Sequence, residues 1–202
     1  MKRVKDIFSS EAEAINRIPV NGFYEDAVNA IYRKVHTDNG KVITSGMGKA
    51  GQIAMNISTT FSSTGTPAVF LHPSEAQHGD LGVIQENDIL LLISNSGKTR
   101  EILELLLLTD NLYKNIPVIV ITSDKESELA EKADYLLLTG KPEEVCILGL
   151  TPTTSTTVMT VIGDALVVLL QEKIGFTRKE YAKRHHGGYL GMKSRGEDNK
   201  YH

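Results

Sequence analysis

The chain has 202 residues, of which 41% are hydrophobic, and its 22 basic and 25 acidic residues give a formal net charge of −3. This length and composition fit one globular domain with a buried core. The weak charge favours neither nucleic acid nor an anionic membrane, so an anionic ligand would need a local binding site. The single cysteine, Cys146, excludes an internal disulfide.

The first residues mix charged side chains into every apolar stretch, so we expect no signal peptide. The strand-like run Ile89–Ile93 is far shorter than the roughly 20 apolar residues that cross a bilayer. We therefore expect a cytoplasmic protein.

Apolar residues at helical spacing predict two opening helices, at 4–18 and 23–35, which stop at Pro19 and at Asn39-Gly40. Strands then alternate with helices, which implies right-handed crossovers and a parallel sheet between helical layers. The strands are predicted at 41–44, 68–71, 88–93, 117–122 and 135–138, and the helices at 50–61, 100–112, 127–132, 153–174 and 178–183. We predict a single domain over residues 1–193 and a polar, disordered tail over 194–202.

Two strand-to-helix loops are rich in glycine and hydroxyl groups, namely Ser45-Gly46-Met47-Gly48-Lys49-Ala50-Gly51 and Ser94-Asn95-Ser96-Gly97-Lys98-Thr99. Both follow strands of the predicted sheet, at the carboxyl ends where ligands bind in open α/β folds. Glycine-rich turns into helix N-termini offer free backbone N–H groups, which suit a phosphate. The alternative is that both loops only cap helices.

Nucleotide motifs are incomplete in this chain. Gly46–Gly51 reads G-x-G-x-x-G, but Leu71-His72-Pro73 stands where a dinucleotide site needs an acidic residue. No Gly-Lys-Ser/Thr follows a four-residue spacer, so there is no Walker A loop. The histidines show no H-x-x-x-H spacing and no C-x-x-C occurs, so we expect no metal site.

Three further segments gather ionisable residues: 75–82, Glu143-Glu144 and His185-His186. Each has a simpler interpretation, as a solvated surface loop, an exposed pair and a helix C-cap. None of them by itself establishes catalysis.

Four motifs in this order resemble the SIS (sugar isomerase) domain: Gly46–Gly51, Ser62-Ser63-Thr64-Gly65-Thr66-Pro67, Glu75-Ala76-Gln77-His78-Gly79-Asp80-Leu81-Gly82 and Ile93-Ser94-Asn95-Ser96-Gly97. Together with the segments 148–157 and 163–166, they resemble the arabinose-5-phosphate isomerases within that family. The resemblance implies a doubly wound, flavodoxin-like α/β/α sandwich with a five-stranded parallel sheet. It also implies a homotetramer with sites at subunit interfaces and no cofactor.

The implied activity is the reversible conversion of D-ribulose 5-phosphate to D-arabinose 5-phosphate, the first step towards Kdo in lipopolysaccharide. The candidate residues carried over fall into two groups. The substrate- and phosphate-binding candidates are Ser45, Gly46, Gly48, Ser94, Asn95, Ser96, Gly97 and Thr99. The catalytic candidates are Lys49, Glu101, Glu144, His185 and His78.

Isomerisation through an enediol needs a base near C1 and C2, proton transfer between the oxygens and stabilisation of the oxyanion. We predict Glu144 as the base and His185 as the group that opens the sugar ring or moves the oxygen proton. Lys49 would stabilise the enediolate or bind phosphate, and Glu101 would orient Lys49 or share the acid–base work. By resemblance, His185 or His78 is expected to complete another chain's site.

Two residues depart from the family pattern. Lys98 stands where relatives usually have Glu, and either tightens anion binding or points to solvent. His186 stands where relatives have Pro. Many relatives carry a pair of CBS domains after this domain, and we expect the present chain to work without it. The alternative functions are isomerisation of another sugar phosphate and a non-catalytic sugar-phosphate sensor.

Overall fold

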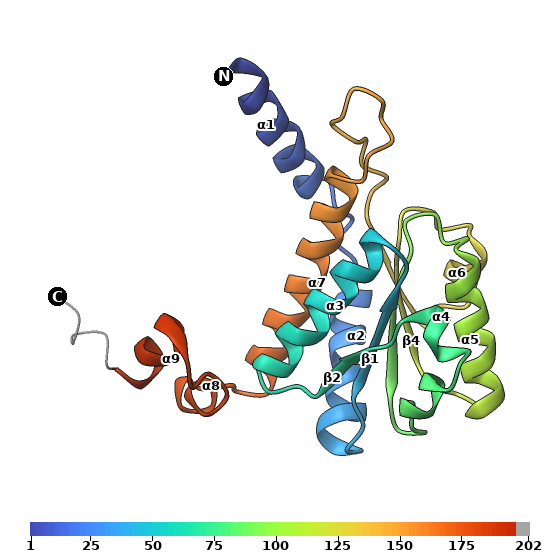
Figure 1. The fold of residues 1–202 in the computed structure, drawn as a ribbon, viewed down its shortest axis with the longest axis vertical. Helices are drawn as coiled ribbons and strands as arrows, with labels where there is room; N and C mark the ends of the chain where they lie inside the picture. The colour runs from blue at the N-terminus through green and yellow to red at the C-terminus, as the bar shows by residue number, and fades with distance from the viewer. Residues whose placement is uncertain (197–202) are drawn as a thin grey trace.

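A computed structural model describes residues 1–196 of the chain. Five parallel strands form one sheet in the order β2-β1-β3-β4-β5, with helices on both faces (Figure 1). The strands are β1 (Val42–Gly46), β2 (Ala68–Phe70), β3 (Ile89–Ile93), β4 (Val118–Thr122) and β5 (Tyr135–Leu138). The predicted fold class, an α/β/α sandwich with a five-stranded parallel sheet, is confirmed.

The helical elements are α1 (Lys2–Asn16), α2 (Phe23–Ile31), η1 (Tyr32–Thr37), α3 (Lys49–Ser63), α4 (Pro73–Ala76), η2 (Asp80–Val83), α5 (Arg100–Leu112), α6 (Glu128–Glu131), α7 (Thr154–Lys173), α8 (Arg178–Arg184) and α9 (Gly188–Arg195). The second predicted helix ends in a π-helical turn, η1. The sequence analysis missed α4, η2 and α9. Each is eight residues or shorter, too short for a helical apolar period to stand out.

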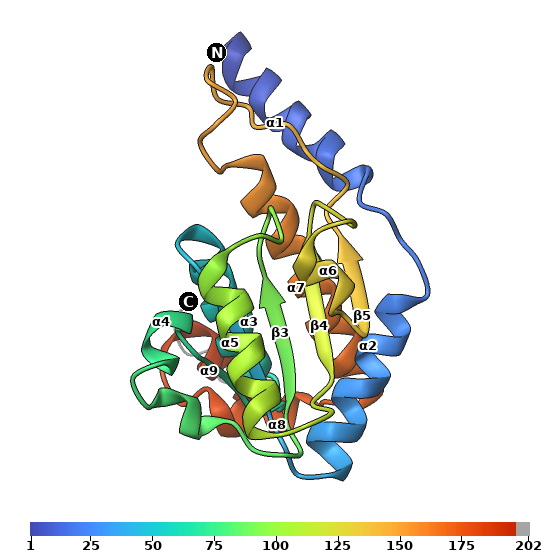
Figure 2. The same cartoon turned by 90° about the vertical axis from the view of Figure 1, so that its right-hand side faces the viewer.

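Successive residues of the central strands face opposite layers, as the period of two in a strand requires. Ile89 and Leu91 of β3 pack in the cluster formed with α2, α3 and α7. Leu90 and Leu92 pack in the cluster formed with α4, α5 and α6. Figure 2 shows α5 and α6 in front of the sheet. Burial on both faces explains why β3 is apolar throughout.

The strand order reverses at β1, which lies between β2 and β3. The crossover through α3 leads from β1 to β2 on the first face, and the crossover through α5 leads from β3 to β4 on the other. Gly46 at the end of β1 pairs in register with Ile93 at the end of β3. The two glycine-rich loops therefore leave the sheet side by side, at its topological switch point.

Parts of the chain project from the sandwich. The helix α1 has no buried residue, and Val4 and Phe8 on it are exposed. The pair α8 and α9 extends to one side (Figure 1). The tail predicted from Ser194 begins too early, because Ser194 and Arg195 belong to α9. Gly196 is the C-cap of α9, and the remaining residues of that predicted tail, 197–202, lie outside the described part of the chain.

The helix α7 is long and apolar enough to cross a membrane by length and composition. It instead packs against α3, α1 and α2. Gly163 allows a close approach to α3, because a Cβ at that position would lie 2.3 Å from the side chain of Ile57. These contacts make α7 a core helix of the fold.

Candidate active site

The first glycine-rich loop joins the end of β1 directly to the first turn of α3. A Cβ on Gly46 would lie 2.7 Å from the backbone of Ala50, so only glycine lets strand and helix approach this closely. Gly48 has a φ of 61° and sets the start of α3. Lys49 is the first residue of that helix and is exposed.

Ser45, a substrate-binding candidate, lies at the end of β1 and is fully buried. Its hydroxyl donates to the carbonyl of Leu71 at 2.7 Å. Ser45 thus joins β1 to the residue that follows β2, whereas Gly48 is exposed in the loop.

The second loop is closed by its own hydroxyl groups. The Ser94 and Thr99 hydroxyls lie 2.8 Å apart, and the Ser94 hydroxyl accepts from the N–H of Gly97 at 3.1 Å. Ser96 accepts from the N–H of Lys98 at 3.2 Å. Asn95 is exposed at the tip of the loop. Because Thr99 is the N-cap of α5, the loop presents hydroxyls and a helix N-terminus together, which suits an anion.

Gly97 fixes the shape of this loop. It has a φ of 63°, and a Cβ at that position would lie 1.9 Å from the hydroxyl of Ser127. The loop therefore packs directly on the start of α6, and no other residue fits there without a shift.

Lys98, the departure from the family pattern, has a partner. Its Nζ lies 3.4 Å from Oδ2 of Asp124. A hydrogen bond from the backbone of Glu126, with the Lys98 ion pair, lowers the pKa of Asp124 below its ordinary value. The charge of Lys98 is thus partly offset beside the loop.

Glu144 lies in the irregular segment 139–153 between β5 and α7, and its carboxylate is held at the start of α7. Oε2 accepts from the backbone N–H of Thr153 at 2.7 Å and from the Thr153 hydroxyl at 2.9 Å. Oε1 accepts from the Ser155 hydroxyl. Burial alone would raise the pKa of Glu144, but the hydrogen bonds from Ser155 and Thr153 outweigh it and lower the pKa.

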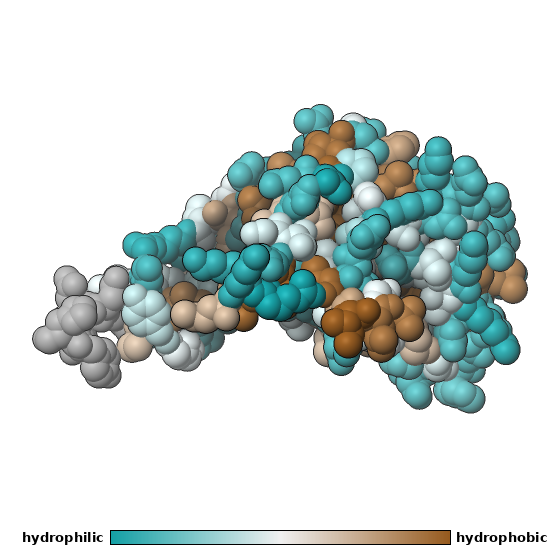
Figure 3. All heavy atoms as spheres, turned by 90° about the horizontal axis from the view of Figure 1, so that it is seen from above, coloured by the Kyte–Doolittle hydropathy of each residue, from teal (hydrophilic) through white to brown (hydrophobic). Residues whose placement is uncertain are grey.

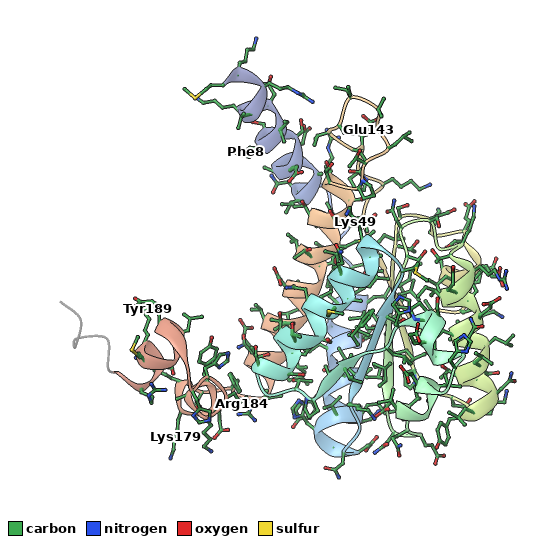
Figure 4. The ribbon with its side chains drawn as sticks, in the orientation of Figure 1. Phe8, Lys49, Glu143, Lys179, Arg184 and Tyr189 are labelled. Atoms are coloured by element: carbon green, nitrogen blue, oxygen red, sulfur yellow. The ribbon has the colours of Figure 1, made fainter. Side chains whose placement is uncertain are left out.

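On its other side Glu144 lines a polar cavity of about 340 Å³ between α1 and the segment 139–145. Figure 4 shows Lys49 and the neighbouring Glu143 at the same end of the molecule. The fold thus brings Glu144, Lys49 and the two loops to the carboxyl end of the sheet.

Glu101 lies in the first turn of α5 and is half-buried, directly after the second loop. His78 is exposed after α4, where the neighbouring Gln77 donates to Glu104 of α5 at 2.8 Å. Glu101 therefore adjoins the loop, whereas His78 belongs to the turn that packs along α5.

His185 lies on the pair α8 and α9, outside the sandwich that carries the other candidates (Figure 1). It is the C-cap of α8, its ring stacks on Tyr181 at 3.6 Å, and its Nδ1 lies 3.0 Å from the Tyr181 carbonyl. Arg184 beside it is on the projecting α8–α9 pair, away from Lys49 (Figure 4). Within residues 1–196, no three His, Cys, Asp or Glu side chains gather to hold a metal ion.

The sequence analysis assigned no role to Thr153, Ser155 or Asp124. The hydroxyl-rich run from Thr151 to Thr157 was a visible signal, because such residues cap helices. The spacing of residues could not predict that this run binds Glu144, which lies about ten residues earlier in an irregular segment.

Residues 37–169 match the family model of the SIS domain. The chain is 45% identical over 191 residues to the arabinose 5-phosphate isomerase KdsD of Yersinia pestis, covering 94% of this chain and 56% of that protein. It is 41% identical over 189 residues to KdsD of Escherichia coli K12, with the same shares covered. The chain thus spans about half the length of the curated relatives it matches.

Solved structures agree with this fold. A Bacteroides fragilis protein, proposed to be a phosphosugar isomerase involved in capsule formation, superposes with a TM-score of 0.92 at 62% identity, over 93% of this chain and 98% of that one. The c3406 protein of Escherichia coli CFT073, in complex with arabinose 5-phosphate, gives a TM-score of 0.80 at 37% identity, over 90% and 95% of the two chains.

Proposed function

Because this chain belongs to the SIS domain family, we propose that it is a soluble, cytoplasmic aldose–ketose isomerase that interconverts D-ribulose 5-phosphate and D-arabinose 5-phosphate. The observation that carries the proposal is the pair of glycine- and hydroxyl-rich loops that meet at the switch point of the sheet. The arabinose 5-phosphate complex of a relative at 37% identity supports this substrate class. The isomerase unit would extend over residues 1–193 and supply arabinose 5-phosphate for Kdo and lipopolysaccharide.

The phosphate would bind at the second loop. The hydroxyls of Ser94, Ser96 and Thr99 and the N-terminus of α5 supply donors for its oxygens. In the first loop, open space lies beside Gly48, where a Cβ would meet nothing within 4 Å, so a ligand would approach the backbone there. Hydrogen bonds within the second loop hold the Ser94 and Thr99 hydroxyls side by side, which would position them for the phosphate.

The chemistry would proceed through an enediol. The Glu144 carboxylate removes the proton from C1 of the ketose and returns it to C2, while the oxygen proton moves from O1 to O2. Lys49 stabilises the negative charge on the enediolate oxygen, or binds phosphate. The bonds balance without a redox partner, since one C–H bond breaks and another forms.

The assembly would be a homotetramer with sites at subunit interfaces. His185 lies on the projecting α8–α9 pair, so it would reach the site of another copy more readily than its own. Large apolar side chains are exposed on α1, on α9 and on the segment 139–153. In that segment, Ile147 is 95% exposed. The face seen from above has brown hydrophobic patches among hydrophilic side chains (Figure 3), as expected of surfaces that meet a second copy.

The first experiment incubates the purified protein with D-ribulose 5-phosphate in D₂O and follows the sugar by NMR. We expect D-arabinose 5-phosphate with deuterium at C2, because a base that exchanges with solvent delivers the proton there. Turnover of a different ketose phosphate would keep the reaction and change the substrate. Binding without any turnover would point to a sensor and overturn the proposal.

The second experiment tests the shared site with two inactive variants, His185→Ala and Lys49→Ala. After mixing and subunit exchange we expect about a quarter of the wild-type activity, because one interface site in four pairs an intact Lys49 with an intact His185. Each variant alone, taken through the same exchange, is the control. Without any recovery in the mixture, His185 would act in its own chain or not at all.

A further inference from the structure

The carboxylate of Glu144 is held far more tightly than that of its neighbour in the sequence. Thr153 gives it two donors, at 2.7 and 2.9 Å, and Ser155 gives a third. Both carboxylate oxygens are therefore occupied, while no comparable bonds hold the adjacent Glu143 within the described residues. The segment that carries Glu144 has no regular structure, so these bonds fix where the carboxylate lies.

We propose that Thr153 and Ser155 are positioning residues for the isomerisation, which orient the Glu144 carboxylate and set the pH range in which it is an ionised base. This inference rests on the proposed function, in which Glu144 moves the C1 proton. Neither of these two hydroxyls, at the start of α7, is among the substrate-binding or catalytic candidates.

The chemistry of the three donors favours one protonation state. Hydroxyl and N–H donors stabilise a carboxylate more than its protonated form. They lie at the N-terminus of α7, where the helix dipole also favours negative charge. The site thus keeps Glu144 ionised, in the only form that can accept the C1 proton.

Two parts of the chain carry the charged and titratable groups near Glu144, its own segment and the helix α1. On its own segment they are Lys141, Glu143 and Cys146, and on α1 they are Arg3, Glu11, Glu13 and Arg17. The closest approaches by α1 are made to other atoms, since Arg3 donates to the carbonyl of Val145 at 2.7 Å and Glu11 accepts from Thr157 at 3.1 Å. The α7 helix has no ionisable residue before Asp164. The groups that donate directly to the Glu144 carboxylate are therefore the Thr153 N–H and the hydroxyls of Thr153 and Ser155.

The geometry also limits the direction of the carboxylate. A base that takes a carbon-bound proton must lie close to that carbon in a defined orientation, and small misplacements are costly. Removing the Ser155 hydroxyl takes away the side-chain donor to Oε1, so the carboxylate is held chiefly through Oε2. Both its direction and its affinity for a proton should change.

The test uses Ser155→Ala and Thr153→Val, with Thr153→Ser as the conservative variant that keeps the hydroxyl. For Ser155→Ala we expect kcat to fall about tenfold or more, with KM within about twofold, because orientation is lost and phosphate binding is not. The acid limb of the kcat profile should move upward by about one pH unit, since a bond that favours the ionised form is gone. In Thr153→Ser, unlike Thr153→Val, the acid limb of the kcat profile should lie where it does in the wild type.

Thr160→Ala is the matched control, because the Thr160 hydroxyl donates only to a backbone carbonyl of the same helix, at 2.9 Å. It should leave the profile unchanged. Thermal unfolding of all variants separates loss of folding from loss of positioning.

A second readout does not depend on activity. The ¹³C resonance of the Glu144 side-chain carboxyl, assigned with Glu144→Gln, reports its titration directly, and its midpoint should rise in Ser155→Ala. If that midpoint and the acid limb rise together, the proposal stands. A rise in the midpoint with an unmoved acid limb would show that Glu144 is not the base and overturn the catalytic part. An unmoved midpoint in both Ser155→Ala and Thr153→Val would overturn the positioning role, whether or not the protein is an isomerase.

Discussion

The loop 94–99 and the segment 139–153 both carry candidate site residues, but they are held in place in different ways. The loop leaves a central strand, closes on its own hydroxyls and packs on Ser127. The segment leaves the edge strand β5 and has exposed apolar residues, among them Ile147 and Leu150. A few side-chain hydrogen bonds hold this segment in place, chiefly those that Glu144 accepts. The loop 94–99 is thus fixed by its own hydrogen bonds and by packing on the core, whereas the position of the proposed base depends on a few side-chain hydrogen bonds.

The largest expected effect comes from removing the proposed base. Glu144→Ala should lower kcat about a hundredfold or more, because general base catalysis typically contributes that much. Steady-state kinetics with D-ribulose 5-phosphate measure it. The neighbouring carboxylate provides the control, and Glu143→Ala should remain within about twofold of wild type. Near-normal turnover in the Glu144 variant would reject its assignment and leave the segment with a capping role for α7.

A smaller effect, on the free energy of unfolding, is expected from a substitution that disrupts the packing of the loop 94–99. Gly97→Ala should destabilise the protein by about 2 kcal/mol, because alanine is strained at a φ of 63° and its Cβ would collide with Ser127. Urea unfolding measures this change. Gly82→Ala is the control, since nothing lies within 4 Å of a Cβ there, and it should stay within about 0.5 kcal/mol. Equal stability of the two variants would mean that the loop is not fixed by its packing.

The smallest effect concerns the reactivity of the segment 139–153. The Cys146 sulfur accepts from the N–H groups of Thr151 and Leu150 at 3.2 and 3.3 Å. A hydrogen bond from the Thr151 side chain, followed by these two backbone bonds, lowers the pKa of Cys146 from 9.0 to about 7. Since the thiolate is the reactive form, the rate of alkylation by iodoacetamide should rise with pH and level off above the pKa.

The half-maximal alkylation rate is therefore expected near pH 7, the value to which the pKa of Cys146 is lowered. Cys146 is the only cysteine, so Cys146→Ser gives the blank, and the urea-unfolded chain gives the unperturbed thiol. A midpoint equal to that of the unfolded chain would show that the turn around Cys146 does not form in solution, and would weaken the contrast between the two regions.

Much of the fold was predictable from local pattern. Apolar runs such as Ile89–Ile93 predicted strands buried on both faces, and the bounds of α5 and β5 were predicted without error. The glycine-rich loops were expected at the carboxyl ends of strands, where they lie. These features follow from short-range spacing, because periodicity and turn chemistry are properties of neighbouring residues.

The tertiary structure decided what the spacing could not. Ser45 reads as a loop hydroxyl in the sequence but is buried against Leu71. Lys98 reads as a free cation but pairs with Asp124. Glu144 reads as half of an exposed acidic pair, yet the start of α7 holds it through Thr153 and Ser155. Each outcome depends on which distant segment the chain brings within about 3 Å, and only the packing of sheet and helices determines that distance.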